Sequence, residues 1–344
     1  MPAGHDSSTQ TGRPTMRDVA ALAGVAVKTV SRVINEVPTV DPGLAGRVHA
    51  AADKLGYRPN LAASNLRSGR TDTIGLLLED VSNPFSAAVH RAIEDYVRDR
   101  GILLLTASLD EDPTRERQLV SRLIDRRVDG LIVVPTAEDH RYIVAEQGHG
   151  TSVVFLDRQP RPLVADAVVT NNRDAACHAV TQLVAGGHRR VAYLGDAQSI
   201  TTAADRYRGY LDAHAKRRLR PLPTLTRHGL RTVDAARNAA LELLAARHPP
   251  DAFFTSQNLV TIGTVQALHH TGRQHDIALI GFDDVPFAET FHPGITVIAQ
   301  DTAGIGRAAA ERVLARIGGD RSPAKLYIVD SIFIPRGSGE IPPP

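Results

Sequence analysis

From residue 74 onward, short apolar runs alternate with stretches of helical periodicity, and this alternation limits the possible folds more than any other feature of the chain. The runs are, in order, IGLLLE, ILLLTAS, GLIVVP, VVFLD, VAYLG, AFFTS, IALIGFDD and TVIAQ. Strands that are separated by helices form parallel sheets, because each connection must cross over the sheet. The runs fall into two tandem sets with a break near residues 170–172, so the sequence predicts two doubly wound halves with a ligand cleft between them.

The charge of the chain is unevenly distributed. Residues 13–70 hold nine lysines and arginines against four acids, a net charge of +5, whereas residues 71–344 carry a net charge of −2. A basic segment attached to a nearly neutral body is typical of a nucleic-acid-binding module.

Cysteine content and the two ends of the chain indicate a compartment. The single cysteine, Cys177, cannot form an internal disulfide, so the fold does not depend on an oxidising environment. Residues 1–14 are polar and lack the apolar core of a signal peptide, and no run of about 18 apolar residues follows. We therefore expect a cytoplasmic protein without a membrane span, with flexible tails at residues 1–14 and 339–344.

The first sixty residues have the pattern of three short helices. Thr15 and Asp18 have the spacing of a capping box, and Gly24 is a stop signal shortly before a second amphipathic stretch. A third helix is predicted between Asp41 as N-cap and Gly56 as stop. This is helix-turn-helix spacing, although a small helical bundle without a partner would show the same pattern.

The exposed side of the second helix favours the DNA-binding alternative. Two cations and two hydroxyl groups are expected there, on Lys28, Thr29, Ser31 and Arg32. These groups can form hydrogen bonds with base edges and phosphates in a major groove, whereas a merely solvated face more often carries acids.

The stretch TMRDVAALAGVAVKTVSRVIN, followed by LGYRPNLAASNLRSGRT, resembles the head and hinge of the lactose-repressor/galactose-repressor (LacI/GalR) family of bacterial transcription regulators. The resemblance implies that Val27, Lys28 and Arg32 occupy base-reading positions and that Thr29 and Ser31 contact phosphates. Lysine and arginine suit guanine O6 and N7, and valine suits a thymine methyl group.

Two departures from the family pattern concern the stability of the head. Ala26 stands where the family usually has a serine N-cap, a difference of about 1 kcal/mol. Gly43 and Gly46 lie inside the third helix, where each glycine costs about 1 kcal/mol relative to alanine. We therefore expect operator affinity to be weaker than in the family, or more dependent on the dimer.

Residues 58–71 correspond to the hinge of the family, which forms a short helix on the operator and inserts a leucine into the minor groove. Leu66 matches that leucine, and the flanking positions are Asn60, Ala63 and Arg67. Such a wedge unstacks a base step to obtain a bent duplex. The alternative is an ordinary linker in which Leu66 is buried.

The resemblance extends to residue 338 and to the periplasmic sugar-binding proteins. It implies a head at residues 15–57 and a periplasmic-binding-protein-like body at residues 72–338, made of two Rossmann-like subdomains. The N-subdomain is expected at about 72–170 and 300–324, and the C-subdomain at about 171–299 and 325–338. The implied effector contacts are Asn83, Phe85, Asp157, Arg158, Thr202, Arg206, Leu230, Gln257 and Asp283.

Several of these residues also have simpler interpretations. Phe85 could stack on an apolar ring face or could belong to the core. Asp157 and Arg158 suit several ligand hydroxyls but could form a structural ion pair, and Asp283 could cap a following helix.

The residues that differ from the family pattern favour sugars or sugar-like polyols over purines. Gln257 and Asn258 replace a usual Asn-Asp pair, which removes a negative charge from the cleft edge. Leu230 stands where purine-binding members have an aromatic ring, so a purine would lose a stacking partner. Because the chain has no tryptophan, stacking must come from Phe85, Tyr207 or Phe282.

An α/β enzyme and an exported solute-binding protein are the alternative functions. GIGRAA, residues 304–309, fits a loose dinucleotide pattern, but P-loop and G-x-S-x-G motifs are missing. The fourteen histidines are scattered, and His188 is expected to be structural, so no metal or cofactor is predicted. The basic head disfavours an exported solute-binding protein.

These observations together predict an allosteric DNA-binding regulator, not an enzyme, that acts as a repressor. Two heads in a homodimer would contact a pseudo-palindromic operator, and effector binding in the cleft would shift the hinges between ordered and disordered states. No leucine heptad follows Arg336, so a dimer is expected rather than a tetramer. Both an inducer and a co-repressor fit this scheme.

Overall fold

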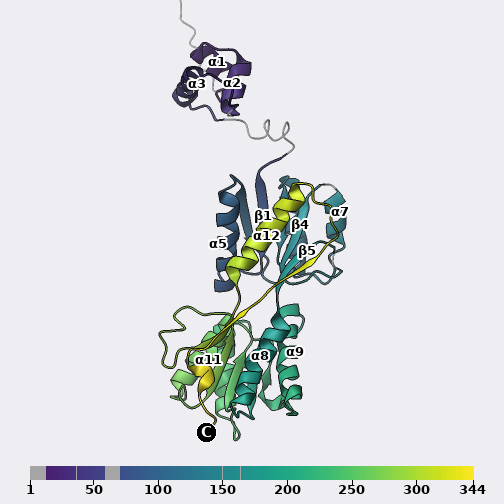
Figure 1. Ribbon diagram of the computed structural model, residues 1–344, viewed down its shortest axis with the longest axis vertical. Coiled ribbons are helices and arrows are strands. Elements are labelled where there is room, and N and C mark those ends of the chain that lie inside the picture. The colour runs from purple at the N-terminus through teal and green to yellow at the C-terminus, as the bar shows by residue number, and fades with distance from the viewer. Residues whose placement is uncertain (1–12, 36, 59–69, 149, 163) are drawn as a thin grey trace, which may run out of the picture. The chain divides into compact units, whose positions relative to one another are not determined.

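The computed structural model describes residues 13–35, 37–58, 70–148, 150–162 and 164–344. The chain forms two compact units, Met1–Thr71 and Asp72–Pro344 (Figure 1). Most of the expected N-terminal tail lies outside the described residues, and so do four of the expected hinge contacts, which are Asn60, Ala63, Leu66 and Arg67.

The first unit contains three helices, α1 (Met16–Ala23), α2 (Val27–Ile34) and α3 (Pro42–Leu55). The capping box before α1 is confirmed, because Thr15 Oγ1 accepts a hydrogen bond from the Asp18 amide and the Asp18 carboxylate accepts one from the Thr15 amide. Ala26 provides no side-chain cap for α2, and Asp41 caps α3. The helices therefore begin where the sequence indicates.

A small apolar core joins these three helices. Val19, Val30 and Val48, one from each helix, are fully buried, and Tyr57 packs against the same core after α3 ends. Each helix thus contributes one apolar face to this core, and the opposite face of α2 lies outside it.

The first half of the body is a six-stranded parallel sheet of order β11-β5-β4-β3-β1-β2. Its strands are β1 (Thr73–Leu78), β2 (Leu103–Ser108), β3 (Gly130–Val133), β4 (Ser152–Asp157), β5 (Asp166–Thr170) and β11 (Leu326–Val329). Its helices are α5 (Pro84–Arg98), α6 (Pro113–Asp125), α7 (Tyr142–Gly148) and α12 (Thr302–Ile317). Figure 1 shows α5 and α12 side by side on this half.

The second half repeats this architecture in the order β12-β10-β9-β8-β6-β7, with β12 antiparallel to β10. Its strands are β6 (Val191–Leu194), β7 (Thr226–Arg227), β8 (Ala252–Thr255), β9 (Ala278–Phe282), β10 (Thr296–Ala299) and β12 (Ile332–Ile334). Its helices are α8 (Asn172–Ala185), α9 (Thr201–Lys216), α10 (Val233–Leu244) and α11 (Asn258–His270), with short 3-10 turns η1 (Pro223–Leu225) and η2 (Ser338–Glu340).

Two glycines let the helices of the second half pack closely in pairs. A Cβ added at Gly209 of α9 would lie 2.3 Å from the Arg173 carbonyl oxygen of α8. A Cβ at Gly263 of α11 would lie 2.4 Å from the Val233 carbonyl oxygen of α10. Backbone therefore packs against backbone in both pairs, which fixes the helix ends that enter the cleft.

The chain passes between the two halves three times, after β5, after β10 and between β11 and β12. Hydrogen bonds connect these crossings. Thr170 Oγ1 donates to Gln300 Oε1 at 2.5 Å, and Asn171 bonds with Asp330 and with Ser331. The hydrogen bonds therefore join the three crossings into one bonded hinge between the halves.

The expected assignment of residues 325–338 to the second half is wrong for its first part. Strand β11 joins the first sheet, with Leu326 paired to Ala167 and Val329 to Thr170, and only β12 lies in the second sheet. The run therefore divides at Asp330, where the chain crosses between the halves.

The expected flexible tail at residues 339–344 is also contradicted over its first part. Glu340 Oε2 accepts hydrogen bonds from Thr296 Oγ1 at 2.9 Å and from the Gly337 amide at 2.7 Å. The Ile341 carbonyl oxygen lies 2.9 Å from Nε2 of buried His188. His188 thus has a structural role, holding the end of the chain on the second half.

Candidate functional site

The outer face of α2 carries the side chains expected to contact DNA. Val27 is 42% exposed, and Lys28 and Arg32 are also exposed, while Thr29 and Ser31 are half-buried. The Arg32 guanidinium donates to Thr39 Oγ1 at 2.6 Å, and Asn35 Nδ2 donates to Ser31 Oγ at 3.3 Å. The helix therefore presents cations, hydroxyls and one apolar side chain on a single face, which suits base edges and phosphates.

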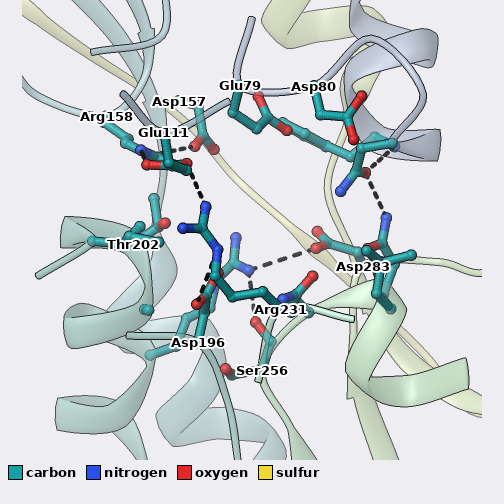
Figure 2. Close-up of a pocket in the computed structure, with 18 of the residues that line it drawn as sticks. Glu79, Asp80, Glu111, Asp157, Arg158, Asp196, Thr202, Arg231, Ser256 and Asp283 are labelled. Carbon is teal, nitrogen blue, oxygen red and sulfur yellow. Dashed lines mark hydrogen bonds and ion pairs between the residues drawn. The ribbon is translucent and has the colours of Figure 1, made fainter. Parts of the chain in front are cut away.

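A cavity of about 300 Å³ lies in the body where the carboxyl ends of strands from both halves meet. Seven carboxylates line it, from Glu79, Asp80, Asp110, Glu111, Asp157, Asp196 and Asp283. Three guanidinium groups accompany them, from Arg158, Arg206 and Arg231. Figure 2 shows Glu79 and Asp157 on one side of this cavity and Asp196 and Asp283 on the other.

Eight of the nine expected effector residues line this cavity, namely Asn83, Phe85, Asp157, Arg158, Thr202, Arg206, Gln257 and Asp283. They come together because each follows the end of a strand or lies in the first turns of the helix after it. The sequence pattern therefore locates the cavity, and the structure supplies their contacts.

Leu230 is the exception. It is buried in the apolar core of the second half, and only its backbone is near the cavity, where its carbonyl oxygen accepts a hydrogen bond from Gln257 Nε2 at 3.1 Å. The next residue, Arg231, lines the cavity instead. The expectation that the Leu230 side chain contacts the effector is therefore corrected.

Of the three aromatic residues considered for stacking, only Phe85 lines the cavity. It also packs against the core of the first half, so its core interpretation is confirmed and stacking on a ligand stays a prediction. Phe282 is fully buried and lies 3.8 Å beneath the Arg206 guanidinium, and Tyr207 packs on Tyr193. The cavity thus offers a ligand one aromatic face from this set.

Arg206 connects the buried polar groups on the floor of the cleft. Its Nε donates to Asn172 Oδ1 at 2.7 Å, its Nη1 donates to the Ser256 carbonyl oxygen at 2.8 Å, and the same Nη1 lies 3.5 Å from Asp283 Oδ2. The arginine is 5% exposed, so these partners replace nearly all of its hydration.

Asp157 and Asp283 occupy equivalent positions in the two halves. Asp157 ends β4 with φ 63° and Asp283 follows β9 with φ 68°, a left-handed conformation that few residues other than glycine adopt. Strained positions of this kind cluster at binding sites. Residues 284–285 are irregular and residues 286–290 form turns, so Asp283 does not cap a helix. Its Oδ1 accepts from Gln300 Nε2 at 2.6 Å.

The alternative of an ion pair between Asp157 and Arg158 describes only the longer of two contacts that Arg158 makes with acids. The Arg158 guanidinium donates both Nη groups to Glu111, one at 2.8 Å, whereas its Nε lies 3.5 Å from Asp157 Oδ2. The bidentate partner of Arg158 is therefore a residue after β2 that the sequence did not single out.

A hydrogen bond between Asn83 and Asn258 joins the two halves across the cleft. Asn83 Oδ1 caps α5 by accepting from the Phe85 amide at 3.0 Å and also accepts from Asn258 Nδ2 at 2.8 Å. Asn83 thus joins the first half to the start of α11 in the second half.

Twelve further residues line the cavity that were not among the expected effector contacts. They are Glu79, Asp80, Asp110, Glu111, Asp196, Ile200, Ala203, Arg231, Ser256, Asn258, Leu259 and Gln300. Glu79 directly follows β1, and Ser86 Oγ donates to its Oε1 at 2.5 Å. Burial and the nearby Asp157 carboxylate raise the pKa of Glu79 to about 7. Position at a strand end was the available signal for Glu79, Glu111 and Asp196.

Comparison with known proteins identifies the family to which the chain belongs. Residues 15–60 match the family described as bacterial regulatory proteins, lacI family, and residues 180–339 match the periplasmic binding protein-like domain. The chain is 34% identical over 338 residues to the HTH-type transcriptional regulator PtxS of Pseudomonas plecoglossicida, covering 96% of both chains. The chain belongs to the LacI family.

Solved structures of LacI-family proteins agree with the fold. The transcriptional regulator CelR in complex with cellobiose is 28% identical, with a TM-score of 0.70 over 95% of this chain and all of that chain. The lac repressor dimer bound to operator and the anti-inducer ONPF has a TM-score of 0.85 at 24% identity, over 95% of this chain and 99% of that chain. The head and two-part body are thus those of a LacI-family protein.

Membership of the LacI family makes this chain a DNA-binding transcriptional regulator with an effector-binding domain. Its relatives are transcriptional regulators, not enzymes. The GIGRAA stretch lies in the first turns of α12, as an ordinary helix start. Among the described residues, every helix is too short or too polar to cross a membrane.

Proposed function

We propose that this protein is a repressor that acts as a homodimer on a pseudo-palindromic operator and responds to a sugar or sugar-like polyol. The observation that carries the proposal is the cleft, where carboxylates from both halves surround Arg206 and Arg158 in about 300 Å³. A sugar offers hydroxyl groups that donate to carboxylates and accept from guanidiniums, which suits this mixture of groups.

Aromatic content supports a sugar over a purine. A purine ring needs flat apolar surfaces. Among the described residues, Phe85 is the single aromatic residue that lines the cavity. Among structural relatives, CelR was solved with the sugar cellobiose.

The same geometry suggests how ligand binding reaches the DNA. Gln300 holds Asp283 in the cleft and also accepts from Thr170, so it belongs both to the ligand site and to the bonded hinge. A ligand that pulls on Asp283 would therefore shift the crossings and the relation of the two halves. In a dimer this change would alter operator affinity.

The DNA-binding role of α2 predicts a specific mutational effect. Arg32→Ala should weaken binding to a duplex selected by the protein from a random library about 10- to 100-fold, because one good base contact is worth about 1–3 kcal/mol. Fluorescence anisotropy with the selected and a scrambled duplex measures this ratio.

Lys54→Ala is the matched control, since it removes an equally exposed cation from α3. It should weaken binding to the selected duplex and to the scrambled duplex to a similar, small extent. If Arg32→Ala behaved as Lys54→Ala does, the assigned base contact would be wrong.

A further inference from the structure

The cleft holds more negative than positive charge. Its seven carboxylates exceed its three guanidiniums by four, and two of the three arginines are already committed to acids. Arg158 is paired with Glu111, and Arg206 with Asp283 at 3.5 Å. Arg231 is half-exposed and lies 4.0 Å from Glu111 and 3.9 Å from Asp196.

Among the described residues, two of the seven lining acids, Glu79 and Asp80, have no salt bridge. Asp80 is exposed and its carboxylate accepts from the Ser82 amide and hydroxyl, so Glu79 is the less solvated of the two. No salt bridge joins it to a basic side chain in the described part of the chain, and its hydrogen-bonding partner there is Ser86. Its second oxygen, Oε2, is inaccessible to solvent and has no hydrogen-bond partner among the described residues. A buried acceptor without a donor is costly, and it becomes favourable when a ligand supplies the donor.

The Asp157 carboxylate also affects which ligand group can bind beside Glu79. Asp157 lies on the same side of the cavity as Glu79, so the two carboxylates repel each other (Figure 2). Burial and this repulsion raise the pKa of Glu79 to about 7. Burial, together with the Asp283 and Glu111 carboxylates, raises the pKa of Asp157. A cation placed between them would remove the repulsion, which a neutral hydroxyl group cannot do.

We propose that Glu79 and Asp157 select an effector that carries a protonated amine, so that the ligand is an amino sugar or an amino polyol. This inference rests on the proposed function and narrows its ligand class. No group of three or more side chains among the described residues is placed to hold a metal ion, which favours an organic ammonium over a metal cation.

The test uses calorimetric titration of the purified full chain at pH 7.5 with matched pairs of ligands. The amines are D-glucosamine, D-galactosamine, D-mannosamine and D-glucamine, and their neutral partners are D-glucose, D-galactose, D-mannose and D-sorbitol. We expect at least one amine to bind at least tenfold more tightly than its partner. Glu79→Gln should abolish this preference, so that the amine and its neutral partner bind with equal affinity.

A second readout separates direct contact from a structural effect. Because the ammonium favours ionised Glu79, binding at pH 7 should release protons, measured as a dependence of the binding heat on the buffer's ionisation enthalpy. The release should disappear in Glu79→Gln and persist in Glu242→Gln, which removes an exposed carboxylate on α10.

The outcomes distinguish this inference from the proposed function. If neutral sugars bind and change DNA affinity while amines bind no more tightly, the amine inference is overturned and the proposed function stands. If neither class binds, both are overturned. An amine preference that survives Glu79→Gln overturns the assignment to Glu79.

Discussion

Replacing Arg206 with alanine should lower the free energy of unfolding of the body by about 3–5 kcal/mol, because it leaves a buried acid without its counter-charge. The substitution removes hydrogen bonds to Asn172 and Ser256, the ion pair with Asp283 and the packing on Phe282. Urea unfolding of the full chain, followed by circular dichroism, measures the loss. Calorimetric titration of the same variant should show no ligand binding.

Arg208→Ala is the matched control for this prediction. Arg208 lies two residues further along α9 and pairs with Asp205 at 2.6 Å, but both side chains are about half-exposed. An exposed pair of this kind is worth less than about 1 kcal/mol. Equal losses in the two variants would mean that the network around Arg206 does not organise the cleft floor.

Glu79→Gln should stabilise the ligand-free protein, and increasingly so as the pH rises. The folded pKa of Glu79 is about 7, above its usual value of 4.5, so the stability contributed by its proton is fully present below pH 4.5 and is lost as the pH rises through 7. At pH 8 this loss amounts to about 3 kcal/mol. Glutamine cannot ionise, so the variant does not lose this stability as the pH rises.

The check is a comparison of unfolding free energies at pH 4.5, 6, 7 and 8 without ligand. The advantage of Glu79→Gln over the natural chain should grow from near zero to about 3 kcal/mol across this series. Glu242→Gln, at an exposed position on α10, should show a flat difference. A flat difference for Glu79→Gln as well would show that the carboxyl is not held in a charge-excluding environment.

Local sequence signals predicted the head better than the pairing of distant strands. The Thr15–Asp18 capping box and the glycine stops act within one helical turn, so neighbouring residues determine them. The division of residues 325–338 depends instead on β11 pairing with β5, far away in the chain. Two apolar runs separated by two residues give no local sign that they belong to different sheets.

The candidate site shows the same limit at the level of single residues. Strand ends located the cavity, but the pattern could not show which way a loop residue turns. The Leu230 amide donates to the Gly195 carbonyl oxygen, and its side chain lies in the core, whereas Arg231 lines the cavity. The sequence likewise shows Glu79 and Glu111 as acids after strands, but only the structure shows that Glu111 has an arginine and Glu79 has none among the described residues.

The central claim is that a ligand in the acidic cleft sets the affinity of this regulator for DNA. The most direct test measures, by fluorescence anisotropy, the Kd of the full chain for its selected duplex. The measurement is made without ligand and with saturating D-glucosamine or D-glucose, and ligand occupancy is verified in the same samples. We expect the Kd to change at least fivefold, with lower DNA affinity if the ligand is an inducer and higher DNA affinity if it is a co-repressor. An unchanged Kd with the cleft occupied would contradict it.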